Sequence, residues 1–135
     1  MAYQITYQQP GNVQFLAYHG EITAQEESDA FVESLTRAGL EANGRILVDR
    51  THGKMLSSPV SVREHVALVK QLSQGLGRLM VAMVAPRDFD FAMSRMFEMS
   101  SAGKLDHQLK VFREMHLACE WLGVEPPAID SVAER

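Results

Sequence analysis

The chain has 135 residues, of which 46% are hydrophobic and 22% are charged, an ordinary balance for one globular domain with its own core. Its net charge of −4 lacks the basic excess that nucleic-acid binding needs, and its single cysteine excludes an intramolecular disulfide framework. No apolar run reaches the ~20 residues of a membrane-spanning helix, and the polar start is unlike a signal peptide. We therefore expect a cytoplasmic protein without nucleic-acid binding or membrane insertion.

The N-terminal segment predicts a β-hairpin followed by a helix. Residues 2–8 alternate between apolar and polar side chains, and a Pro-Gly-Asn turn separates them from a second strand over 13–18. Thr23 and Glu26 have the spacing of a capping box, in which each side chain bonds the backbone of the other. A helix is expected to begin there.

Two short apolar runs, 46–49 and 79–84, predict strands covered on both faces, as in parallel sheets. A helix is expected after each. The first begins either with Ser58 as its cap and proline at its first position, or with Ser61 as its cap. The second begins with Asp88 as its cap. The side chains of this second helix that are expected in the core are Phe89, Ala92, Met93, Met96 and Phe97.

A last strand over 109–112 and a closing helix that ends at Gly123 complete the order β-β-α-β-α-β-α-β-α. This order predicts an α/β fold: a mixed, mostly parallel sheet of about five strands, made of an N-terminal hairpin and then βα units, with about four helices. We expect one domain over 1–124 and a polar C-terminal tail over 125–135.

Ligands of open α/β sheets bind beyond the carboxyl ends of the parallel strands. Asp49, Arg50 and His52 follow one predicted strand and Arg87 follows the next, while Arg95 lies on the helix beyond it. These five residues are the candidate ligand-binding set. The alternative is that Asp49 and Arg50 pair with neighbours and only hold their loop in place.

No catalytic constellation can be identified in the sequence. The five histidines lack metal-binding spacings, no nucleophile elbow or phosphate-binding glycine loop is present, and Cys119 lies on an apolar helix stripe. We therefore expect no enzymatic activity, no metal and no cofactor.

The helix after Asp88 is apolar on more than one face. Phe91, Arg95 and Met99 follow each other at intervals of four residues beside the expected core face, so they form a candidate interaction face. Five of the eight methionines lie between 80 and 99, where methionine builds adaptable binding surfaces or fills an ordinary flexible core.

Several short pieces occur in an order that resembles a known family. They are 20–23 (GEIT), 46–49 (ILVD), 84–86 (VAP) with 95–98 (RMFE), and 111–113 (VFR) with 118–123 (ACEWLG). From about Ala2 to Val124 the chain resembles the SpoIIAA-like branch of the STAS fold, the sulfate transporter and anti-sigma-factor antagonist domain. That fold is similar in shape to CRAL-TRIO lipid-transfer domains.

The resemblance implies a place to look for a regulatory phosphoserine. Classical antagonists carry this serine after an aspartate, at the start of the helix that follows the third strand. Ser57 and Ser58 lie at about this place, but Leu56 stands where the acid would be and Pro59 follows directly. We therefore expect a helix cap here rather than a phosphosite.

Two functions from different classes remain. The first is a non-enzymatic STAS-like interaction or regulatory module that binds a protein partner or, as a homodimer, itself. The second is a carrier or sensor that binds an apolar anionic, lipid-like molecule in a Met/Phe-lined pocket, with Arg87 or Arg95 at its head group. A filled core with an exposed 91–99 stripe favours the module, whereas an apolar cavity with a basic residue at its mouth favours the carrier.

Overall fold

The computed structural model describes residues 2–8, 11–36 and 39–127. Its elements, in chain order, are β1 (Tyr3–Gln8), β2 (Val13–Ile22), α1 (Ala24–Thr36), β3 (Arg45–Met55), α2 (Pro59–Leu72), β4 (Met80–Val84), α3 (Asp88–Ser101), β5 (Gln108–Phe112) and α4 (Met115–Leu122). The strands form one sheet in the order β1-β2-β3-β4-β5. β1 is antiparallel to β2, and the other pairs are parallel. The predicted α/β fold is thus confirmed; most of the predicted tail, 128–135, lies outside the described residues.

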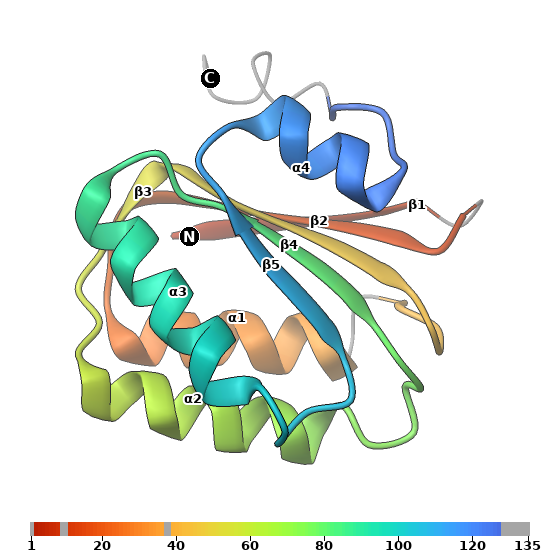
Figure 1. Cartoon of the computed structure of the whole chain (residues 1–135), viewed down its shortest axis with the longest axis horizontal. Helices are drawn as coiled ribbons and strands as arrows, with labels where there is room; N and C mark the ends of the chain where they lie inside the picture. Colours follow the sequence, from red (N-terminus) through yellow and green to blue (C-terminus); the bar gives the residue numbers. More distant parts are fainter. Residues whose placement is uncertain (1, 9–10, 37–38, 128–135) are drawn as a thin grey trace.

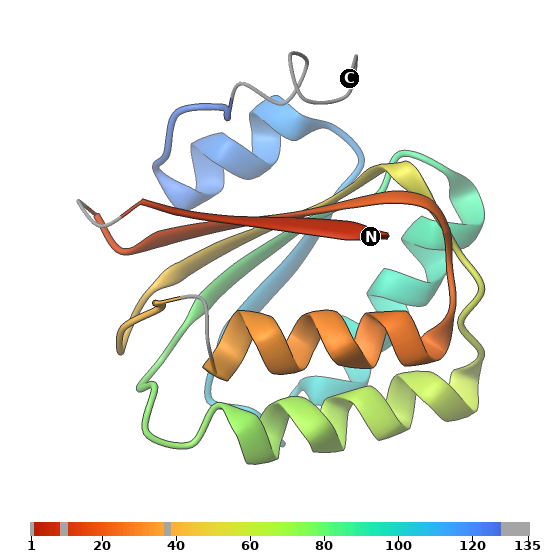
Figure 2. The same cartoon turned by 180° about the vertical axis from the view of Figure 1, so that it is seen from behind.

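The helices are divided unequally between the two faces of the sheet. Figures 1 and 2 show α1, α2 and α3 on one face and α4 alone on the other. The larger apolar core lies under the three helices, and a smaller one lies under α4. α4 packs mainly on β3, β4 and β5, and its core also includes Val13 and Phe15 of β2, so the part of this face formed by β1 is covered least.

β2 and β3 are longer than the apolar runs that predicted them. We expected a loop directly after the strand 46–49, and this prediction is wrong, because β3 pairs with β2 as far as Met55. Between Ala17 and His19 the register shifts: β2 advances two residues while β3 advances three, from Asp49 to His52. This bulge changes which face the following side chains occupy, and it returns Met55 to the core.

Contacts within a few residues explain where the helices begin. The Thr23–Glu26 capping box is confirmed, with N···O distances of 3.1 Å from the Glu26 amide and 2.9 Å from the Thr23 amide. Ser58 caps α2 with proline at the first position, so the first of the two alternatives holds. The prediction of Asp88 as the cap of α3 is wrong, because Asp88 is already helical. Arg87 is the cap residue, and its side chain makes no capping bond to the first-turn backbone.

The core-facing side of α3 is turned relative to the predicted one. Met93 and Phe97 are buried as expected, but Phe89 is 54% exposed. Asp90, which is 1% exposed, is buried in its place. Its carboxylate accepts hydrogen bonds from the Met55 N–H at 3.0 Å and from Arg87 Nε at 2.9 Å. The bond to Met55 ties α3 to the end of β3 and sets the rotation of the helix.

Candidate functional site

The five predicted ligand residues do not meet at one site. Asp49 faces the side of the sheet that carries α4, whereas Arg50 on the next position reaches Glu27 of α1 under the three-helix layer. His52 is exposed on β3, where its ring stacks on His19 with centroids 6.4 Å apart. Arg87 and Arg95 are each paired with a carboxylate of α3 itself, at 2.9 Å and 2.7 Å.

Arg50 belongs to a buried network that joins α1, β3 and α2. Its Nη2 lies 2.8 Å from Glu27 Oε1, and the two side chains are 3% and 6% exposed. The Ser57 hydroxyl donates to Glu27 Oε2 at 2.8 Å, and His65 Nδ1 lies 3.7 Å from the same oxygen. Glu27 is not among the site residues predicted from the sequence. Glu27 lies four residues before Phe31, which is buried, and this helical spacing is the signal that would have placed Glu27 on the inner face of the helix.

The surroundings of this network leave no space for a ligand. Arg50 Cζ lies 5.1 Å from the centroid of the Tyr18 ring, and burial raises the pKa of Tyr18. Within the described part of the chain, Tyr18 Oη and Arg50 Nε have no hydrogen-bond partner. The cavity beside Arg50 has a volume of about 10 Å³, which holds one water molecule at most. The network therefore has the character of a structural tie between helices and sheet.

The two serines suggested by the resemblance already have structural roles. Ser57 is 8% exposed and bonds Glu27, while Ser58 accepts the Ser61 N–H at the start of α2. A phosphate on Ser57 would be placed against the carboxylate of Glu27, with like charges in a buried position. This geometry supports the cap interpretation.

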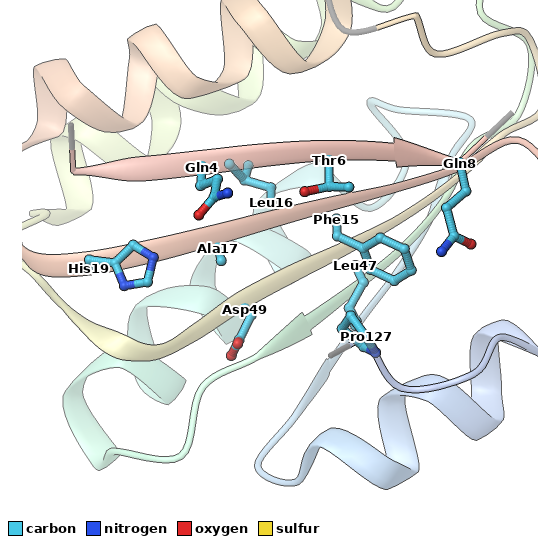
Figure 3. A pocket seen from close by; sticks show the side chains of 10 residues that line it. All are labelled: Gln4, Thr6, Gln8, Phe15, Leu16, Ala17, His19, Leu47, Asp49 and Pro127. Carbon is cyan, nitrogen blue, oxygen red and sulfur yellow. The ribbon is translucent and has the colours of Figure 1, made fainter. Parts of the chain in front are cut away.

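A groove of about 230 Å³ lies on the half-covered face of the sheet, beside Pro127. Figure 3 shows the side chains that line it: Gln4, Thr6, Gln8, Phe15, Leu16, Ala17, His19, Leu47, Asp49 and Pro127. Asp49 is 3% exposed, and its Oδ1 accepts the N–H and hydroxyl of Thr51. Among the described lining residues no lysine or arginine is present, so the groove does not match an anionic head group.

A second groove, called here the α3–β5 groove, runs along the edge of the sheet and has a volume of about 670 Å³. It is lined by Phe91, Arg95, Glu98, Met99, Ser101, Ala102, His107, Gln108, Leu109, Lys110, Val111 and Trp121. All three residues of the predicted interaction face, Phe91, Arg95 and Met99, line it, and Met99 is 66% exposed. The sequence did not indicate that an edge strand and Trp121 of α4 would join them.

The methionine-rich region encloses little free space. The apolar cavity between the sheet and α1, α2 and α3, lined among others by Phe31, Met83 and Phe97, measures about 40 Å³. Ligand pockets typically measure about 300–1,000 Å³.

The described residues contain no group of three or more His, Cys, Asp or Glu arranged to hold a metal ion. None of the helices described combines the length and hydropathy that crossing a membrane requires.

Comparison with known proteins identifies the fold. No protein-family model and no curated protein matches the chain. A DUF3478-family protein from Shewanella loihica, described as uncharacterised and SpoIIAA-like in fold, superposes with a TM-score of 0.54 at 18% identity, over 90% of this chain and 92% of its own. The anti-sigma factor antagonist SpoIIAA in its unphosphorylated form superposes with a TM-score of 0.44 at 12% sequence identity, over 91% of this chain and 100% of its own. The chain thus has a SpoIIAA-like fold, as its sequence pieces predicted.

Proposed function

We propose that this protein is a non-enzymatic interaction module that binds a protein partner through the α3–β5 groove. The observation that carries the proposal is the composition of this groove, where Phe91, Met99 and Trp121 lie along an edge strand. Aromatic residues, methionine and arginine are enriched at protein interfaces. Met99, which is 66% exposed, offers apolar surface beside Phe91 that a bound partner would cover.

The carrier hypothesis has less support. The cavity of about 40 Å³ beneath the helices is far smaller than a lipid chain requires. Arg87 and Arg95, the candidates for the head group, already neutralise Asp90 and Glu98. A filled core beside an exposed 91–99 stripe is the arrangement that favours the module.

Site-specific photocrosslinking tests the proposal. Benzoylphenylalanine replaces Met99 in one variant and Leu117 in another, and both are expressed in the organism from which the chain comes. Leu117 is a matched control because it is 43% exposed, lies on α4 and does not line the groove. We expect one discrete protein adduct from position 99 and none from position 117. Absence of an adduct at 99, or equal adducts at both positions, would refute the proposal.

A further inference from the structure

We propose that the partner binds the α3–β5 groove as an added β-strand: an extended segment pairs with the free edge of β5 and places an acidic side chain opposite Lys110. This inference rests on the proposed function, because it specifies how the same groove recognises its partner. Four observations carry it: the direction of the β5 backbone, the position of Glu98, the walls of the groove and its charge.

Among the described residues, no strand pairs with the outer edge of β5, which is the last strand of the sheet. The Gln108 N–H donates to the Leu79 carbonyl at 2.9 Å, and the Ala85 N–H donates to the Phe112 carbonyl at 2.8 Å. In a parallel pair, alternate residues direct their backbone groups to the same neighbour. Residues 108, 110 and 112 therefore face β4, and Leu109 and Val111 direct their N–H and C=O groups into the groove.

Glu98 occupies the position that a neighbouring strand would take. The Val111 N–H donates to Glu98 Oε1 at 3.1 Å, and Arg95 Nη1 holds Oε2 of the same carboxylate at 2.7 Å. Native proteins protect sheet edges with charged side chains or with a neighbouring helix, and the Glu98 carboxylate of α3 protects the edge of β5 in this way. Because the Glu98 side chain is 23% exposed, it can rotate away without unpacking the core. Its oxygen thus stands in for a backbone carbonyl of the partner.

The two sides of the groove suit the alternating side chains of a strand. Figure 1 shows β5 at the edge of the sheet, with α3 on one side and α4 on the other. Successive side chains of an incoming strand point to opposite faces. One set would pack on Phe91 and Met99 of α3, and the other on Trp121 of α4.

The charge of the edge selects a different chain over a second copy. Lys110 is exposed, its Nζ lies 5.5 Å from the centroid of the Phe112 ring, and it forms none of the ion pairs recorded between described residues. Two β5 strands paired antiparallel over their full length would place Lys110 opposite Lys110, and like charges directly opposite are destabilising. An aspartate or glutamate at that place forms a favourable cross-strand pair.

The test selects random ten-residue peptides, displayed on phage, against the full chain and synthesises the enriched ones. We expect alternating apolar residues with at least one acid, and protection of the Leu109 and Val111 amides from hydrogen exchange when the peptide binds. The Glu98→Ala variant should bind about fivefold more tightly, because the peptide no longer displaces a bond of about 1 kcal/mol. A role of Glu98 limited to holding the fold would instead weaken binding.

Three further variants complete the experiment. Leu109→Pro removes an outward-facing donor and should abolish binding, and Lys110→Glu should weaken it about fivefold for acidic peptides. Lys70→Glu, which makes the same charge change on α2 outside the groove, should leave it unchanged. Circular dichroism verifies that each variant is folded. The protection of the edge amides from hydrogen exchange is measured on the wild type, so it tests the inference even if a variant does not fold.

Several results would overturn the inference. No enrichment of peptides, enrichment without protection of the edge amides, or a dimer in sedimentation that Leu109→Pro dissociates would each refute it. If the crosslink from position 99 survives Leu109→Pro and Lys110→Glu, strand addition fails while the proposed function stands. Absence of any crosslink from position 99 refutes the proposed function itself.

Discussion

Replacing Arg50 by methionine tests whether the buried network holds the three-helix layer against the sheet. Arg50 and Glu27 form an ion pair of 2.8 Å between side chains that are 3% and 6% exposed. The variant keeps the apolar stem of the side chain but removes the guanidinium group, which leaves Glu27 as a buried carboxylate without its cation. Its remaining neighbours are the hydroxyl of Ser57 and the ring of His65.

The expected loss follows from these contacts. Removing one partner of a buried ion pair costs about 3–5 kcal/mol, since the other charge remains buried. Because Ser57 continues to donate to Glu27, we expect the lower end, about 3 kcal/mol. The double variant Glu27→Gln with Arg50→Met removes both charges and keeps an acceptor for Ser57, so we expect it to lose only about 1 kcal/mol.

Urea unfolding followed by far-UV circular dichroism measures these free energies. Arg95→Met is the matched control, because it breaks an ion pair of similar length, 2.7 Å, whose arginine is 45% exposed. Exposed pairs contribute about 0–1 kcal/mol. The reasoning is refuted if Arg50→Met costs no more than the control, or if the double variant is less stable than Arg50→Met alone.

Three other features lead to predictions of their own. His107 accepts the Leu79 N–H at Nδ1, and burial lowers the pKa of its ring. As pH drops through about 6.5, the unfolded chain therefore binds a proton at His107 before the folded chain does, and the stability that His107 contributes falls. The stability advantage of wild type over His107→Gln in urea should shrink between pH 7.5 and 5.5, and a constant advantage would contradict this. Cys119 is 2% exposed, and burial raises the pKa of its thiol. Ellman's reagent should therefore label the native protein on the order of 100-fold more slowly than the urea-unfolded chain, and equal rates would show that the thiol is accessible. Ser58→Ala removes the cap of α2 and should cost about 1 kcal/mol in the same unfolding assay, whereas an unchanged midpoint would mean that the capping box is not stabilising.

Contacts that are local in the chain could be predicted from the sequence. The Thr23–Glu26 box and the Ser58 cap each join groups three residues apart, so the spacing of residue types identifies them. The apolar runs of β3 and β4 likewise predicted buried parallel strands, because helices cover both faces of the sheet centre. The order of the elements then predicted a mixed, mostly parallel α/β fold, and the resemblance of several short sequence pieces to the SpoIIAA-like branch implied that particular fold.

The ends of these elements depend on distant partners. Residues 50–54 are mostly polar, yet they belong to β3 because β2 pairs with them through the bulge. Asp90 is buried because the Met55 N–H, far away in the chain, needs an acceptor. Neither the helical period of α3 nor the charge of Asp90 contains this information, and so the predicted core face of the helix was turned the wrong way.

The candidate site likewise combines features set by local contacts with features set by distant ones. Spacing of four residues placed Phe91, Arg95 and Met99 along one line of a helix, which is a property of the helix alone. Only the tertiary structure decided that this line borders the free edge of β5, that Glu98 bonds Val111, and that Trp121 forms the opposite wall. Periodicity is a local property of the backbone, whereas an edge is created by the order in which strands pair, and that order depends on contacts across the whole chain.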